Sequence, residues 1–497
     1  MAEQTVAKSL FVLFADIPTS RWIELTLIDE KLNNGDEVTV VYCDGVLPAC
    51  TINHNADRSI CNACIGRTRY HLGLLKKLSD VHSLSEYVTE DAIHQVGEIS
   101  SAVFLKNLNE PCERFGYGPL SSAVSFTRDM NFSIDSTKSL ATTYYRSSLR
   151  VWSTLSVVFS TLAPDVVYVH NGRLAEYQTT YLLLKSLSLK CVTHEICCPP
   201  KHFAQFTNGR IHDRECYKSL ILDSTQHVSP DIIAQVAKQY FESKRNGTSK
   251  YQNFTSNQSY GQLDSVLSET SEVLTIFTSS EDEFACLGPE WDYPIYSSQI
   301  SGIIDVVGYV RSTNSSVKIV VRMHPNMSAM PYCDLKPYYD LVSMQVIVVE
   351  PQSKIHSYEL VDRSSKILTF GSTIGIEGTY WGKPVIQVGH SPFDFLDVCY
   401  IPESRMQLME LLNSNLESRP ASNTHKFAYT LLHGGDILNK IDADKWLFKG
   451  KRVLDIQNGT GLRLQGMFKS PLWAFLSSEF RTCCLLIMRT CSQLFNH

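Results

Sequence analysis

The chain has 497 residues, of which 43% are hydrophobic and 19% charged, so it is long and apolar enough to bury two substantial cores. Its net charge of −6, from 45 basic and 51 acidic residues, provides no global positive field, so nucleic acid is not an expected partner. Fifteen cysteines, an odd number spread along a long chain, favour reduced thiols over a disulfide framework.

The N-terminal part has the alternation of a Rossmann-like unit. Residues 10–16 are predicted as a buried strand, 20–35 as an amphipathic helix with a glycine stop, and 37–45 as a second strand. Helices at 146–160 and 175–188 and strands at 165–170 and 190–196 complete a first domain over 1–245. This unit lacks a GxGxxG fingerprint, so no dinucleotide cofactor is expected and the loop after the first strand is free for an acceptor.

The two ends of the chain bear on its location. The apolar core near the N-terminus is short and is followed by Asp16, so this segment is not expected to be a signal peptide. No run approaches about 20 apolar residues, so no transmembrane helix is expected. The last residues, 466–497, mix aromatic, aliphatic and basic side chains, which suits either a packed helix or one resting on anionic lipid. A cytoplasmic protein, with peripheral contact at the inner face of the membrane as an option, is the expectation.

A group of cysteines lies early in the chain, in what reads as an insertion over 43–64. Cys61 and Cys64 have the spacing of one half of a tetrahedral zinc site, and Cys43 and Cys50 are the candidates for the other half. The separation of Cys43 from Cys50 is not a standard zinc-ribbon spacing. A structural zinc and four free thiols packed as small hydrophobic groups both remain open.

Further along, residues 246–272 are rich in serine, asparagine and glutamine, which predicts a linker, although the aromatic Phe254 and Tyr260 suggest that it folds against a domain. A second Rossmann-like domain is predicted over 273–415, with strands at 273–278, 317–322, 346–349, 366–370 and 384–388. Residues 416–497 are predicted as a helical extension, part of which crosses back to the first domain.

Two segments of the second domain carry the clearest chemistry. In KILTFGSTIGIEGTYWGKPVIQVG (366–389), Gly371 lets the backbone turn sharply, and Ser372 and Thr373 open a short helix whose free N–H groups attract a phosphate. Glu377 lies one turn beyond Thr373 and has the acceptors to bind a ribose.

The other segment, VRMHPN (321–326), ends a β-branched run. His324 follows this strand, and Pro325 stiffens the turn, so the imidazole has few alternative positions. A phosphate or leaving-group oxygen is its natural partner.

These segments resemble the C-terminal domain of GT-B glycosyltransferases of the bacterial capsule-polysaccharide type, which include CMP-Kdo and CMP-sialic acid transferases. TIFTSSEDEF (275–284) is similar to the serine turn after the first strand of that domain. VVYVHNGR (166–173) looks like the FNGR segment of capsule-biosynthesis proteins, with His170 in place of the phenylalanine. The resemblance covers residues 10–410. UDP-N-acetylglucosamine 2-epimerases share this architecture.

The resemblance implies an α/β, GT-B-like fold of two Rossmann-like domains with a cleft between them. It also implies a group of residues that binds the donor nucleotide: Ser279, Ser280, Arg322, His324, Pro325, Gly371, Ser372, Thr373 and Glu377. Asn171, Gly172 and Arg173 are expected to hold an anionic acceptor sugar or the donor carboxylate, because arginine binds carboxylates through two hydrogen bonds.

An inverting, metal-independent sugar transfer is the predicted activity, with no cofactor required for catalysis. The donor is a nucleotide-sugar, a CMP-sugar in preference to a UDP-sugar, and the acceptor is a surface polysaccharide or a lipid-linked glycan. His324 is expected to assist the departing phosphate, and a first-domain carboxylate to take the acceptor proton. The candidates for that base are Glu195, Asp16 and Asp44, each placed after a predicted strand.

Two other functions remain open. A sugar-nucleotide 2-epimerase uses the same architecture but needs several carboxylates around the sugar and no acceptor cleft. A scaffold of a capsule-assembly complex would keep the fold and lack the catalytic base.

Overall fold

The computed structural model describes residues 6–89, 115–198, 201–249, 254–263, 267, 272–284 and 286–439, together with the pairs 441–442, 447–448 and 451–452. Residues 1–439 form one compact unit and 440–497 another. Of the second unit, the described part consists of three short antiparallel strands, β13 (Ile441–Asp442), β14 (Leu447–Phe448) and β15 (Lys451–Arg452). The predicted lipid-contacting segment 466–497 lies outside the described residues.

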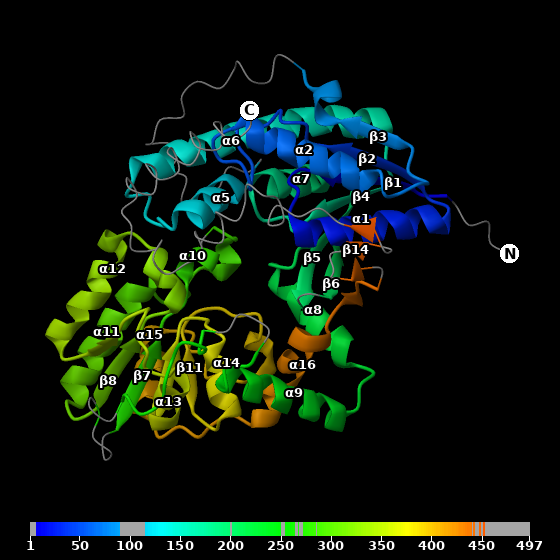
Figure 1. The fold of residues 1–497 in the computed structure, drawn as a ribbon. Helices are drawn as coiled ribbons and strands as arrows, with labels where there is room; N and C mark the ends of the chain where they lie inside the picture. Colours follow the sequence, from blue (N-terminus) through cyan, green and yellow to red (C-terminus); the bar gives the residue numbers. More distant parts are fainter. Residues whose placement is uncertain are drawn as a thin grey trace, which may run out of the picture. The chain divides into compact units, whose positions relative to one another are not determined.

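The N-terminal sheet is built around a parallel core (Figure 1). Its order is β12-β6-β5-β4-β1-β2-β3, in which β3, β2, β1, β4 and β5 run parallel. The strand β6 pairs antiparallel with β5, and β12 antiparallel with β6. The bounds are β1 (Lys8–Leu13), β2 (Glu37–Tyr42), β3 (Asp80–Ser83), β4 (Val166–His170), β5 (Lys190–Cys198), β6 (His202–Thr207) and β12 (Asp436–Ile437).

Helices connect these strands. They are α1 (Pro18–Asn34), α2 (Arg58–Leu72), α5 (Gly118–Thr127), α6 (Asp135–Leu162), α7 (Ala175–Ser186), α8 (Arg214–Thr225) and α9 (Pro230–Arg245), with a 3-10 turn η1 (Leu84–Tyr87). The helix α1 ends as predicted, because Gly35 adopts φ of 89° and its N–H donates to the Lys31 carbonyl. We call the part from β1 to α9 the N-terminal half.

One helix is longer than the sequence predicted. The prediction placed a helix at 146–160, whereas α6 begins at Asp135. Its first turns contain serine and threonine, which have low helix propensity. Thr137, Ala141 and Tyr144 are nevertheless buried at helical spacing, so tertiary packing extends the helix over this polar segment.

The C-terminal sheet is entirely parallel, with the order β11-β10-β7-β8-β9. Its strands are β7 (Val273–Phe277), β8 (Lys318–Arg322), β9 (Ile347–Val349), β10 (Lys366–Thr369) and β11 (Val385–Gln387), close to the predicted positions. The α-helices are α10 (Glu281–Phe284), α11 (Gln299–Thr313), α12 (Tyr332–Tyr339), α13 (Ser357–Arg363), α14 (Ile374–Tyr380) and α15 (Arg405–Asn413). The 3-10 turns are η2 (Pro289–Trp291), η3 (Pro325–Ala329), η4 (Asp340–Met344) and η5 (Asp394–Leu396). We call the part from β7 to α15 the C-terminal half.

Both sheets have the same strand order around their first strand. The strand β1 lies between β2 and β4, and β7 lies between β8 and β10, so the strand order reverses direction in each sheet. Ligands of such sheets bind outside the carboxyl ends of the strands at this reversal. The predicted α/β class with two Rossmann-like halves is therefore confirmed.

The chain returns to the N-terminal half after α15. Through η6 (Ala421–Thr424) it reaches α16 (His425–His433), which packs against α8 and α9 (Figure 1). The sequence predicts a crossing helix in this extension. The extension was predicted as helical throughout, but β12 follows α16 and pairs with β6, because an open sheet edge offers unpaired backbone groups.

None of the described helices combines the length and the apolar composition that a bilayer crossing needs.

The return helix α16 is tested by Phe427→Ala. The Phe427 ring is buried and packs edge-on against Phe393, with ring centroids 5.1 Å apart, and beside Tyr217 of α8. Removing it should lower the free energy of unfolding by about 3–5 kcal/mol, measured by urea denaturation. Met406→Ala, at an exposed helical position, is the control and should change it by less than about 0.5 kcal/mol. Equal stability of the two variants would show that α16 is not docked.

Candidate functional site

A cavity of about 730 Å³ lies where strands of both sheets end. This volume is within the range of about 300–1,000 Å³ that is usual for small-molecule sites. All of the predicted nucleotide-binding residues line it: Ser279, Ser280, Arg322, His324, Pro325, Gly371, Ser372, Thr373 and Glu377. From the N-terminal half, Arg173 and Glu195 are the predicted residues that line it. The fold thus brings most of the candidate residues into one space.

The turn after β7 is tied to the neighbouring strand ends. The Ser279 hydroxyl donates to the Phe370 carbonyl at 2.7 Å, and the Ser279 N–H donates to Gln299 Oε1 at 2.6 Å. The Thr278 hydroxyl accepts from the His324 N–H at 2.8 Å. These bonds hold the ends of β7, β8 and β10 together at the cavity.

The turn after β10 requires glycine. Gly371 has φ of 95°, and a Cβ there would overlap the His390 carbonyl. The Ser372 N–H donates to Thr369 Oγ1 at 3.2 Å, which closes the turn before α14. The turn therefore lies closer to the backbone after β11 than a side chain would allow.

Arg322 is the most unusual group in the cavity wall. It is buried, and its Nη1 donates to the Glu350 carbonyl, but Nε and Nη2 have no hydrogen-bond partner among the described residues. Burial lowers its pKa to about 10, so the guanidinium is still charged at neutral pH. A buried cation with two unused donors makes this wall a site for an anion.

His324 lies beside it as a neutral hydrogen-bonding group. Burial, and secondarily the Arg322 charge, lower the pKa of His324 to about 4. Its Nδ1 accepts a hydrogen bond from the Asn326 N–H at 3.2 Å, so the ring proton is on Nε2. At neutral pH, His324 therefore presents an N–H donor and no charge.

Glu377 lines the cavity from the same half of the molecule. Its Oε2 accepts a hydrogen bond from the Tyr358 hydroxyl at 2.6 Å, and Tyr358 also lines the cavity. Burial raises the pKa of Glu377, although the charge of Lys244 opposes this. The carboxylate can accept hydrogen bonds from sugar hydroxyls.

The opposite wall contains Glu195, which has a largely buried carboxylate. Its Oε2 accepts from Asn171 Nδ2 at 2.6 Å and lies 3.5 Å from His170 Nε2. Its Oε1 accepts from the Ile196 N–H at 2.8 Å. Asn171 and Gly172 form the turn after β4 with φ of 56° and 74°, and they shape this wall without lining the cavity.

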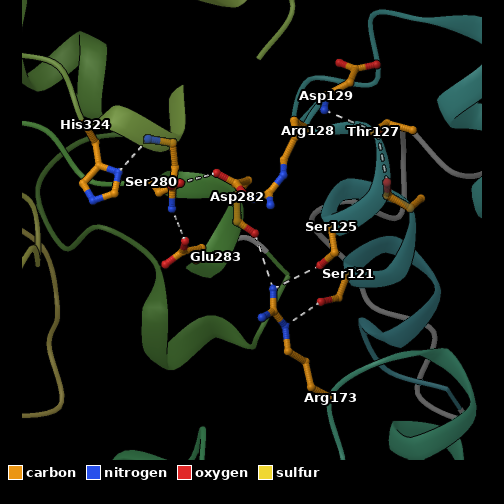
Figure 2. A network of polar contacts seen from close by, with 12 residues as sticks. Ser121, Ser125, Thr127, Arg128, Asp129, Arg173, Ser280, Asp282, Glu283 and His324 are labelled. Carbon is orange, nitrogen blue, oxygen red and sulfur yellow. Dashed lines mark hydrogen bonds and ion pairs between the residues drawn. The ribbon is translucent and has the colours of Figure 1, made fainter. Parts of the chain in front are cut away.

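Arg173, the next residue, does line the cavity and links the two walls (Figure 2). Its Nε donates to Ser121 Oγ at 3.0 Å, and Nη2 donates at 3.4 Å to Ser125 Oγ and to the Asp282 carbonyl. Burial lowers the pKa of Arg173. It is the basic group that the N-terminal half presents to a ligand beside Glu195.

The short helix α10 joins the network (Figure 2). The Asp282 carboxylate forms an ion pair with Arg128 and accepts from the Ser280 hydroxyl at 2.6 Å. Asn326, which orients His324, donates through Nδ2 to Glu283 Oε1 at 2.8 Å. The anion-binding wall and the Arg173 wall are thus connected through one polar network.

Two of the predicted base candidates do not belong to this site. The Asp16 carboxylate is buried and contacts two arginines and a histidine, with Arg21 Nε at 3.1 Å, Arg67 Nε at 2.6 Å and His71 Nδ1 at 3.3 Å. Although burial opposes it, this environment holds the pKa of Asp16 well below its usual range, so the carboxylate is a poor base. Asp44 accepts a hydrogen bond from the Ser85 N–H. Neither lines the cavity, whereas Glu195 does.

The cysteines give no support to a zinc site. Among the described residues, no group of three or more His, Cys, Asp and Glu side chains is placed to hold a metal ion. Cys43 and Cys50 pack beside an apolar core, and burial raises the pKa of Cys43 to about 12. Cys61 Sγ accepts from Asn53 Nδ2 at 3.1 Å, and Cys64 is buried on α2. The free-thiol interpretation fits these positions, because Cys43 and Cys50 pack as small apolar groups and Cys64 is buried.

Sequence reasoning missed several residues of the cavity: His212, Lys244, Phe254, Glu283 and Tyr358. The Phe254 ring packs edge-on against His324, with centroids 4.9 Å apart. The aromatic residues of the predicted linker were a signal for this contact. His212 and Lys244 had no such local signal, since they follow neither a predicted strand nor a motif.

Comparison with known proteins gives the following matches. No protein-family model and no curated protein matches the chain. Similar solved structures include two β-Kdo transferases of Thermosulfurimonas dismutans KpsC. The 2,4 transferase has 14% identity and a TM-score of 0.37 over 53% of this chain and 79% of its own. The 2,7 transferase has 13% identity and a TM-score of 0.34, and the match covers 56% of this chain and 81% of the transferase. A UDP-GlcNAc 2-epimerase of Methanocaldococcus jannaschii has 10% identity and a TM-score of 0.28, and the match covers 86% of this chain and 100% of the epimerase.

The structural role of Asp16 is tested by Asp16→Asn. The substitution removes one of the two carboxylates that pair with the buried Arg21, because Glu24 remains, and it also removes the carboxylate that Arg67 contacts. It should lower the free energy of unfolding by about 1.5–3 kcal/mol at pH 7. Because the folded-state pKa lies below the unfolded value of about 3.9, this stability is fully present above that pH and is lost as the pH falls below it. Urea denaturation across this range measures the difference from the wild type. Asp44→Asn is the control, and equal losses in the two variants would contradict the assignment.

Proposed function

We propose that the protein transfers a sugar from a nucleotide-sugar donor to a glycan acceptor. The observation that carries the proposal is the placement of an unpaired, buried guanidinium, Arg322, in a cavity whose other wall holds the carboxylate of Glu195. A phosphate-bearing donor fits the first wall, and a hydroxyl that must lose a proton fits the second.

The donor phosphate is bound by Arg322 through Nε and Nη2 and by the Nε2–H of His324. Since His324 is neutral, Arg322 supplies the positive charge of this wall. The Ser372 hydroxyl, which also lines the cavity, adds a further donor to the phosphate. Glu377 accepts hydrogen bonds from the ribose hydroxyls.

The reaction is an inverting displacement at the anomeric carbon. The acceptor oxygen forms the new C–O bond while the bond from that carbon to the phosphate oxygen breaks. Glu195 takes the acceptor proton, and Asn171 holds its carboxylate in position. The departing nucleotide carries the negative charge, which Arg322 and His324 stabilise. The proposal contains no metal-dependent step.

The sequence resemblance supports the substrate classes. It favours a CMP-sugar over a UDP-sugar as donor, and a surface polysaccharide or lipid-linked glycan as acceptor. Arg173 would bind a carboxylate on either sugar, because its guanidinium lines the cavity beside Glu195. A cytoplasmic site of action, with peripheral membrane contact, belongs to the same proposal.

A sugar-nucleotide 2-epimerase is the second candidate. One observation favours it, since the carboxylates of Glu195, Glu283 and Glu377 all line the cavity. Incubation with CMP- and UDP-sugars separates the alternatives. Nucleotide released only with a glycan acceptor supports transfer, an altered nucleotide-sugar without acceptor supports epimerisation, and binding without turnover supports a scaffold.

The role of Arg322 is tested by Arg322→Met. Loss of a charge-assisted contact of about 1.5–3 kcal/mol should weaken nucleotide binding by about 10- to 100-fold, measured by thermal shift and calorimetry with CMP and UDP. The ligand-free protein should keep its stability, because an uncompensated buried charge is removed. Lys318→Met, at the other end of β8, is the matched control. Unchanged nucleotide affinity in the Arg322 variant would refute the site.

The role of Glu195 is tested by Glu195→Gln. Without the base, kcat for acceptor-dependent transfer should fall by about 10²–10⁴-fold, while nucleotide binding stays at the wild-type value. Glu215→Gln on α8, which is highly exposed, serves as the control. A kcat within a few-fold of the wild type would assign the base to another residue.

A further inference from the structure

His212 lies in a turn that both halves hold in place. The Asp213 carboxylate accepts from the Arg210 N–H at 2.7 Å and from its Nε and Nη2 at 3.0 and 2.6 Å. The Asp213 N–H donates to the Arg210 carbonyl at 3.0 Å. From the C-terminal half, Trp291 Nε1 donates to the His212 carbonyl at 2.9 Å. The backbone that carries the imidazole is therefore fixed before any ligand enters.

The His212 ring lines the cavity together with Arg173 and Glu195. Its Nε2 is buried and has no hydrogen-bond partner among the described residues. Leaving a buried polar nitrogen unsatisfied costs folding free energy, and native proteins rarely do so without a reason. Arg322, whose Nε and Nη2 also have no hydrogen-bond partner among the described residues, faces the proposed phosphate. His212 is on the opposite, N-terminal wall, where the sugars of the reaction would lie.

The charges around His212 decide what it can bind. Burial, and then the charges of Arg173, Arg210 and His170, hold the pKa of His212 well below its ordinary value. The ring is thus neutral at physiological pH, unlike the nearby guanidinium groups. A neutral imidazole nitrogen suits an uncharged partner with one donor or acceptor, and a sugar hydroxyl is such a group.

We propose that His212 Nε2 forms a hydrogen bond with a sugar hydroxyl of the reacting complex. The inference rests on the proposed function, and it adds a substrate-contacting residue to the wall of Glu195 and Arg173. The hydroxyl belongs either to the acceptor or to the sugar being transferred, and the experiment below separates these two sources.

The test compares His212→Asn with His212→Gln. The glutamine amide reaches the position of Nε2, whereas the asparagine amide reaches only that of Nδ1. For an acceptor hydroxyl, kcat/KM for the acceptor should fall by about tenfold in H212N and recover in H212Q, with unchanged binding of the nucleotide-sugar. For the transferred sugar, H212N should instead weaken binding of the nucleotide-sugar but not of the free nucleotide. His227→Asn, at an exposed histidine away from the cavity, is the control.

Two results would overturn the inference. One is wild-type kinetics and binding in H212N. The other is an equal loss in H212N and H212Q, which would indicate packing. If H212N does not fold, ¹⁵N-histidine NMR of the wild-type protein decides, with the His212 signals assigned from H212Q. The Nε2 shift should change with nucleotide-sugar or acceptor and not with free nucleotide, and a constant shift refutes the contact. Failure of the proposed function would give a different result, because the wild-type protein itself would then neither bind nor turn over any nucleotide-sugar.

Discussion

The cavity depends on one buried positive charge, the guanidinium of Arg322. Two of its nitrogens, Nε and Nη2, have no hydrogen-bond partner among the described residues, so this wall suits an anion. A buried guanidinium is costly unless it is hydrogen-bonded, so the ligand-free protein keeps an unfavourable arrangement. The strand β8 fixes the residue between β7 and β9, so the side chain starts from a rigid element. An anion that enters the cavity recovers the missing hydrogen bonds. Binding and stability are therefore linked at this residue.

The cavity combines charged arginines with neutral histidines. The arginine charges help to keep the histidines unprotonated. His324 and His212 are each buried near arginine, which keeps both imidazoles uncharged. In the proposed function, Arg322 and Arg173 recognise charge, and the imidazoles supply directional hydrogen bonds. The network through α10, with Asp282 bonded to residues of both halves, connects the walls that carry these groups (Figure 2). A site organised before binding loses less entropy when its ligand is ordered.

Asp16 and Glu195 illustrate how environment separates similar carboxylates. Asp16 follows β1, whereas Glu195 lies within β5, and both are largely buried. Asp16 is surrounded by cationic partners, so its charge stabilises the fold and its basicity is low. Glu195 is held mainly by an amide and a backbone N–H, and it lines the cavity. Only the second environment leaves a carboxylate available to a substrate.

The amino-acid sequence by itself determined the strand positions and the turn chemistry. Parallel strands buried on both faces are continuous apolar runs, and Gly35, Gly371 and the His324–Pro325 turn act through local backbone geometry. The tertiary structure alone decided which carboxylate reached the cavity and that His212 and Lys244 line it. Arg128 and Asp282, for example, meet across more than 150 positions. Such contacts depend on how whole elements pack, and neither periodicity nor motif spacing records this packing.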